Sequence, residues 1–265
     1  MELAKGKQEK YLRRLEGFLT QARSLLPDGS KAKVSKQQVM KILGTLYYIT
    51  EIVPTRRPLY RHTLQLLRDF HDSSVFAERY VNRNVFDELS NWRRFLADTD
   101  VIRSSFLLPP SILPVTIFTD AEPRGLGVII NDCWATHFPL SPKWIDYASQ
   151  PGNIAAPEAF AVEAAVQQLL SLGIVRSNGL SIGCDNKVVV DCWRKGRSNN
   201  KYVNDTIHRL LLLCEEHQVT LFLTYVHTGA NPADAVSRGT IAPHLKPFPN
   251  SIAPPPGTVG SRDPY

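Results

Sequence analysis

The sequence lacks several features that would assign a protein to a class at once. Its four cysteines, Cys133, Cys184, Cys192 and Cys214, show no CxxC spacing and have no neighbouring histidines, so a zinc site has little support. Buried free thiols in a reducing compartment are the simpler interpretation. No run of about 18 or more apolar residues occurs, and the charged N-terminal segment has no apolar signal-peptide core. We therefore expect an intracellular, soluble protein of the nucleus or cytoplasm, with no membrane partner.

The composition is that of an ordinary globular protein, but its charge is unevenly distributed. The 265 residues are 43% hydrophobic and 21% charged, enough for one large or two modest domains. Residues 1–100 hold 18 Lys+Arg against 12 Asp+Glu, a balance of +6, whereas residues 101–265 hold 13 of each. This asymmetry favours a polyanionic partner such as a nucleic acid. The alternative is a basic solvated surface without function.

The first hundred residues have helical periodicity. The apolar spacing predicts helices over residues 7–26, from an N-cap at Ser35 to just before Pro54, from Pro58 to about Asp69, and from Asn84 to Ala97. Residues 1–105 are therefore predicted to form a small all-α module.

The pattern changes near residue 106. Three prolines within residues 106–114 predict a linker. Strands are then predicted over residues 115–119, 126–131, 134–139, 180–184 and 220–226, and helices over 157–172, from about 187, and over 204–217. This order predicts an α/β domain over residues 106–242, with a mixed five-stranded sheet flanked by helices. The proline-rich tail, residues 243–265, is expected to be extended or partly disordered.

Four acidic residues occupy unusual settings for charged side chains. Asp120 and Asp185 each end an apolar strand, Glu158 opens a helix, and Asp234 follows the last strand and a loop. Taken singly, Asp120 and Asp185 could cap a turn and a helix, and Glu158 could favour a helix dipole. Together, converging carboxylates call for a divalent cation, and ligation by oxygen alone favours Mg²⁺ or Mn²⁺. Two such ions about 4 Å apart would serve phosphodiester hydrolysis.

A family resemblance supports the joint interpretation. The segments FTDAEPRGLGVII, PEAFAVEAAV, IGCDNKVVV and YVHTGANPADAVSRG resemble, in order, the four acidic motifs of the ribonuclease H domain in reverse transcriptases. The Asp-Asn pair at 185–186 and NPADAVSRG look most like those of DIRS-type retrotransposons and hepadnavirus-like polymerases. KVSKQQVMKILGTLYYITEIVP and LSNWRRFL are similar to the thumb or connection segment that precedes ribonuclease H. The resemblance covers about residues 30 to 240.

The resemblance implies a ribonuclease H-like fold and a ligand set of Asp120, Glu158, Asp185 and Asp234 for two Mg²⁺ or Mn²⁺ ions. Glu163 is a rival to Glu158, which is preferred because Ala161 and Ala165 match the small-residue face that follows the family's glutamate. His227 lies seven residues before Asp234. It could correspond to the flexible histidine that the family places before the last acid, but a surface histidine explains it equally well.

Candidate nucleic-acid contacts fall in three groups. Beside the acids lie Asn186, Ser237 and Arg238. The segment that follows the Asp185 region contributes Arg194, Lys195, Arg197 and Lys201, for which a solvated turn is an equal alternative. In the basic helical part the candidates are Lys31, Lys33, Lys36, Arg56, Arg57, Arg93 and Arg94, whereas Trp92 is assigned to the core.

The expected function is metal-dependent endonucleolytic cleavage of the RNA strand in an RNA–DNA hybrid. One alternative is a domesticated retroelement fragment that acts as a non-catalytic nucleic-acid-binding or assembly subunit of a ribonucleoprotein. Another is cleavage of DNA or structured RNA by the same centre. A YxDD-type polymerase motif is missing, so the chain is not expected to be a reverse transcriptase by itself. Whether it is a free-standing protein or a fragment, and whether it works with a separate polymerase, stays open.

Overall fold

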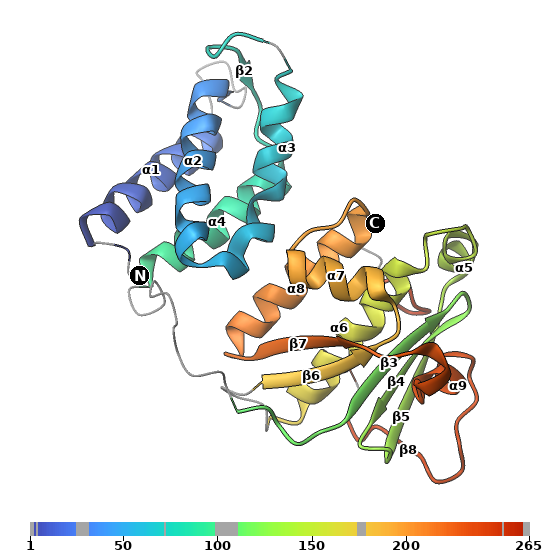
Figure 1. The fold of residues 1–265 in the computed structure, drawn as a ribbon. Coiled ribbons are helices and arrows are strands. Elements are labelled where there is room, and N and C mark those ends of the chain that lie inside the picture. The colour runs from blue at the N-terminus through green and yellow to red at the C-terminus, as the bar shows by residue number, and fades with distance from the viewer. Residues whose placement is uncertain are drawn as a thin grey trace. The chain divides into compact units, whose positions relative to one another are not determined.

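The chain divides into two compact units, Met1–Phe106 and Leu107–Tyr265 (Figure 1). This computed structural model describes residues 3, 5–24, 32–71, 73–98, 111–173, 179–250 and 252–261. Residues 106–110 of the predicted linker, and Lys31 among the candidate contacts, lie outside the described residues.

Over its described residues, the first unit is mostly helical and contains one short antiparallel ladder. Its elements are α1 (Lys5–Arg23), β1 (Val34–Ser35), α2 (Lys36–Ile52), the 3-10 helix η1 (Pro54–Tyr60), α3 (Arg61–Asp69), β2 (Glu78–Arg79) and α4 (Arg83–Ala97). The predicted cap at Ser35 is confirmed. Its hydroxyl accepts from the backbone of Gln38, whose side chain accepts from the Ser35 backbone N–H.

The predicted start of α3 at Pro58 is wrong, because a distant carboxylate caps this helix. Pro58 lies inside η1, and α3 begins at Arg61. Glu88 of α4 accepts hydrogen bonds from the backbone N–H groups of His62 and Thr63, at 2.9 and 2.8 Å. These are N–H groups that the first turn of a helix leaves without internal partners. The helix start therefore depends on a contact between segments far apart in the sequence.

The core of the first unit contains Trp92, as predicted. Its side chain is fully buried, and its indole N–H donates to the carbonyl of Leu59 at 2.6 Å. The guanidinium of Arg56 lies 3.5 Å from the centre of the Phe95 ring, and Arg56 is only 5% exposed. Arg56 thus contributes packing and a cation–π contact instead of a surface charge.

The second unit contains the predicted mixed sheet. Its strands are β3 (Ile117–Glu122), β4 (Gly125–Ile130), β5 (Trp134–Pro139), β6 (Gly179–Cys184), β7 (Thr220–Tyr225) and β8 (Lys246–Pro247). They form one six-stranded sheet in the order β7-β6-β3-β4-β5-β8. β3, β4 and β5 pair antiparallel, whereas β6 pairs parallel with β3 and with β7. The α/β fold class and the five predicted strands are confirmed, and β8 is an addition.

Helices lie on both faces of this sheet. They are α5 (Pro142–Ala148), α6 (Ala155–Ser171), α7 (Lys187–Lys195), α8 (Lys201–Glu216) and α9 (Ala233–Ser237), with the 3-10 turn η2 (Thr228–Ala230) before α9. Val128 and Ile130 of β4 join the core formed with α6, whereas Ile129 packs against Val236 of α9. Because neighbouring residues of a strand point to opposite faces, α6 and α9 cover opposite faces, as Figure 1 shows.

The sequence predicts an extended or partly disordered tail, and its described residues, 243–250 and 252–261, have little regular secondary structure apart from β8. This part of the chain is nevertheless attached to the sheet, because Lys246 donates its backbone N–H to Cys133 and Val259 donates its own to Pro139. Its Gly257 backbone also packs on the ring of Trp144, a residue of the unpredicted helix α5. All four cysteines are free, but only Cys184 and Cys214 are buried, while Cys133 and Cys192 are half-buried. None of the helices described here is long and apolar enough to cross a bilayer.

Candidate metal centre

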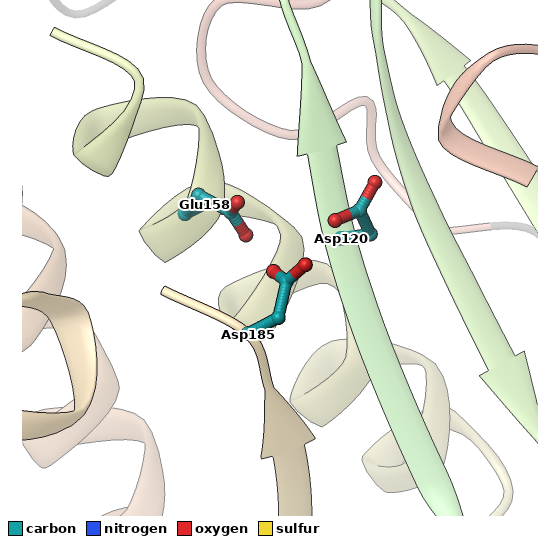
Figure 2. A group of neighbouring side chains, drawn as sticks. All are labelled: Asp120, Glu158 and Asp185. Atoms are coloured by element: carbon teal, nitrogen blue, oxygen red, sulfur yellow. The ribbon is translucent and has the colours of Figure 1, made fainter. Parts of the chain in front are cut away.

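Three carboxylates from different elements meet at the carboxyl end of β6. Asp120 lies in β3, Glu158 in the first turn of α6, and Asp185 directly after β6 (Figure 2). Thr119 pairs with Cys184 in the parallel β3–β6 ladder, so the residue that follows each of them emerges at the same level. One oxygen from each of the three carboxylates lies within 4.8 Å of the others. The convergence expected from the sequence is therefore present for these three residues.

A second acidic group shares Asp120 with the first. Oxygens of Asp120, Glu122 and Asp234 also lie within 4.8 Å of one another. Asp234 enters from the first turn of α9, a helix that the sequence pattern did not predict after the last strand and its loop. Glu122 was not among the predicted site residues. Its signal in the sequence is the two-residue spacing from Asp120, which places both side chains on the same face of β3.

The position of α9 depends on small residues in β4 and on polar contacts to β3. A Cβ atom at Gly127 would lie 2.5 Å from the Ser237 backbone nitrogen, so only glycine permits this approach. Gly127 thus permits the close packing of α9 on β4. Asn231 donates its side-chain amide to the Thr119 carbonyl at 3.0 Å, and the Ser237 hydroxyl donates to Asp120. These contacts hold Asp234 close to Asp120.

Burial makes this cluster costly without a cation. Asp120 and Glu158 are each 4% exposed. Desolvation, which outweighs the stabilising hydrogen bond from Ser237, raises the pKa of Asp120 to about 7, and the charge of Asp185 adds to the shift. The pKa of Glu158 lies well above its usual value for the same reason, with further contributions from Asp120 and Asp185. A divalent cation would balance these charges, and the donors are the oxygens that Mg²⁺ and Mn²⁺ prefer.

The two glutamates of α6 have different environments. Glu158 belongs to the first acidic group. The Glu163 side chain is 3% exposed and receives two hydrogen bonds from Arg209 of α8, at 2.8 and 2.7 Å. Glu163 therefore belongs to a nearly buried ion pair between helices. The geometry separates the two alternatives that the sequence left open.

Several candidate contacts beside the acids have structural roles. The Asn186 side chain caps α7 by accepting from Val188 and Val189, so Asp185 is not the cap of that helix. Ser237 is fully buried against Asp120, which removes it as a contact to a scissile strand. Arg238 donates to Glu122 and Asp234.

The remaining candidates lie elsewhere on the chain. His227 is exposed and accepts from the Gly229 backbone, and among the described residues it belongs to neither acidic group. Four basic residues are exposed at the end of α7, on the connection that follows it and at the start of α8: Arg194, Lys195, Arg197 and Lys201. Arg56 is buried, and the side chain of Arg57 lies outside the described part of the chain.

The raised pKa of Asp120 predicts a pH-dependent affinity for metal. Protons compete with the cation for this carboxylate, so Mn²⁺ affinity is expected to rise about tenfold between pH 6 and pH 8. In excess chelator, the pKa of Asp120 in the folded protein exceeds its value in the unfolded chain. The contribution of Asp120 to stability is then present at low pH and is lost as pH rises through about 7. Calorimetric titration with Mn²⁺ and thermal melting in chelator would measure both effects. An affinity and a melting temperature that do not change across this range would contradict the prediction.

Comparison with known proteins gives similarities only among solved structures. No protein-family model matches the sequence, and no curated protein matches it. An LC11 ribonuclease H1 in complex with an RNA/DNA hybrid is 15% identical, with a TM-score of 0.40, covering 48% of this chain and 96% of that chain. A foamy viral protease-reverse transcriptase dRH with double-stranded DNA is 10% identical, with a TM-score of 0.31, covering 84% of this chain. The same viral enzyme with an RNA/DNA hybrid is 8% identical, with a TM-score of 0.27, covering 95% of this chain. The chain spans 38% and 29% of those two viral proteins.

Proposed function

We propose that this protein is a two-metal endonuclease of the ribonuclease H type, which cleaves the RNA strand of RNA–DNA hybrids. The observation that carries this proposal is the pair of acidic groups that share Asp120, built from β3, α6, the end of β6 and α9. Retention of like charges in a buried position has a cost that a purely structural role does not require. The order of the four acidic motifs supports a relation to reverse transcriptases, most like those of DIRS-type retrotransposons and hepadnavirus-like polymerases.

The chain's own residues have separable tasks in this mechanism. Asp120, Glu158 and Asp185 would hold one cation, while Asp120 and Asp234, with Glu122 beside them, would hold the other. Bound Mg²⁺ or Mn²⁺ would supply an activated water and stabilise charge on the leaving oxygen, giving a 5′-phosphate and a 3′-hydroxyl. Ser237 fixes the orientation of the shared Asp120 carboxylate by donating to one of its oxygens. No side-chain nucleophile is required.

The exposed basic residues are proposed to grip the nucleic-acid backbone. In the second unit they lie at the end of α7, at the start of α8 and on the connection between these helices. In the first unit, Arg23, Arg93 and Arg94 line a hollow of about 540 Å³ between α1 and α4. Each arginine that contacts a phosphate releases counterions, so the double substitution Arg93→Ala/Arg94→Ala is expected to lower the salt slope of hybrid binding by about two. Binding titrations at several salt concentrations would measure this slope. An unchanged slope would show that Arg93 and Arg94 do not contact the phosphates of the hybrid.

The proposed activity is tested by incubating purified, folded protein with strand-labelled substrates in Mg²⁺ or Mn²⁺. Hybrid, DNA duplex, RNA duplex and single strands are compared, with chelator as the control. Cleavage of the RNA strand of the hybrid alone, lost in chelator, is the expected result. Cleavage of DNA or structured RNA would support the same centre with a different substrate. Binding without cleavage of any substrate would favour the non-catalytic retroelement-derived subunit.

A further inference from the structure

A guanidinium lies against the second acidic group. The Arg238 Nη2 atom donates to a Glu122 carboxylate oxygen at 2.9 Å and to an Asp234 oxygen at 2.8 Å. Its Nε atom donates to the same Glu122 oxygen at 3.2 Å. Two of the three carboxylates in this group are therefore bridged by one positive charge that belongs to the chain itself.

The bridge uses oxygens that a divalent cation would also need. A Mg²⁺ ion requires oxygens about 2.1 Å away in near-octahedral geometry, so its ligands must turn toward it. Glu122 and Asp234 instead direct one oxygen each to Arg238. Among the described residues, the hydrogen bonds of Arg238 to acids go to Glu122 and Asp234, whereas Asp120 of the first acidic group accepts from the neutral Ser237 hydroxyl. The two cation positions are thus chemically different.

The arginine is placed where it can leave the acids without disturbing the core. Arg238 follows the last residue of α9, and its side chain is 59% exposed. Glu122 and Asp234 are about one-third exposed, at 34% and 31%. An ion pair with this exposure is weak and readily exchanged for another cation.

Resting on the proposed function, we propose that Arg238 is an internal cation that competes with the second divalent ion for Glu122 and Asp234. Arg238 thereby sets the metal concentration at which the second position fills, while the first position fills independently of it. A phosphate of the substrate offers the displaced guanidinium a new anionic partner. Substrate and second metal would consequently bind with positive coupling.

The test is equilibrium Mn²⁺ binding to the full chain without nucleic acid. Calorimetry and electron paramagnetic resonance of free Mn²⁺ measure this binding. Arg238→Ala is expected to tighten the weaker site about fivefold, because two partly exposed ion pairs no longer oppose the metal. The tighter site should be unchanged. Arg238→Lys keeps the charge but is a poor bridge between two carboxylates, so its effect should be intermediate. Arg83→Ala, which removes an exposed arginine paired with Asp87 at 3.5 Å, is the charge-matched control and should leave both sites unchanged.

The outcomes separate this inference from the proposed function. If Arg238→Ala leaves the weaker site unchanged or weakens it, the arginine orients Glu122 and Asp234 as ligands and the competition is refuted. Arg238→Lys gives the same discrimination if the alanine variant does not fold. Two Mn²⁺ sites with the expected shift, but no cleavage of any substrate, would reject the proposed enzyme and keep the competition. Absence of Mn²⁺ binding by the wild type at millimolar concentration would reject both.

Discussion

Asp120→Asn and Asp185→Asn are each expected to reduce hybrid cleavage by roughly a thousandfold or more, while the protein stays folded. Each change replaces a charged ligand by a neutral amide of nearly the same shape. Asp120 should be the more sensitive position, because it belongs to both acidic groups, whereas Asp185 belongs to one. Single-turnover cleavage of a strand-labelled hybrid in saturating Mg²⁺ measures the loss.

A stability measurement accompanies this prediction. Because burial raises the pKa of Asp120 to about 7, its ionised form is disfavoured in the folded protein without metal. Asp120→Asn removes that charge, so in chelator at pH 8 the variant should melt at a higher temperature than the wild type. Its amide oxygen can still accept the hydrogen bond from Ser237. If the folded Asp120→Asn variant cleaves at the wild-type rate, the proposed metal centre is not needed for cleavage.

Glu158→Gln and Glu163→Gln are expected to have opposite consequences, although both residues lie in α6 and are buried. Glu158→Gln should lose cleavage to a similar extent as Asp185→Asn, with little loss of stability, because its carboxylate repels its neighbours. Glu163→Gln should leave the metal sites in place but lower the free energy of unfolding by about 2 to 3 kcal/mol. It removes the carboxylate that accepts two hydrogen bonds from Arg209, at a position where the Glu163 side chain is only 3% exposed.

This pair of variants controls for the effect of substitution in one helix. Chemical denaturation measures the free energy of unfolding of each variant. Mn²⁺ titration measures its metal binding, and hybrid cleavage measures its activity. Arg209→Met combined with Glu163→Gln should recover part of the lost stability, because both charges of the pair are then removed. If Glu163→Gln abolished metal binding in a stable protein, the assignment of the two glutamates would have to be reversed.

Local patterns made much of this fold predictable. The β-branched and apolar runs that form β3, β4, β5, β6 and β7 favour strands by their own composition. The spacing of apolar residues in the long helices likewise favours helix. Asp120 and Asp185 follow such runs at matching positions. Their meeting required only that the two strands pair in parallel, as the order of elements implied. Ser35 was readable as a cap because a capping box is local.

Contacts between distant segments were not readable in the same way. The start of α3 depends on Glu88, twenty-five residues beyond Thr63, so Pro58 misled the prediction. The tail is held by pairing with β5 and packing on Trp144, although its proline content indicates disorder in isolation. The burial of Arg56 depends on Phe95. In each case the local composition predicts only what the segment would do in isolation. Its conformation or burial in the protein depends on a contact with a residue elsewhere in the chain.

By itself, the sequence determined the α/β class of the second unit, its five main strands and the acids expected to converge, because strand propensity and the position of an acid after an apolar run are local properties. The structure extends β3 to Glu122, so Asp120 lies inside that strand and not at its end. Only the tertiary structure placed Glu158, and not Glu163, with the other acids, added Glu122 to the second acidic group, and showed why Gly127 is needed beneath α9. These depend on distances of a few ångströms between segments as far as 117 residues apart, as between Asp120 and Ser237. Side-chain partners of that kind follow from packing, which no local pattern encodes.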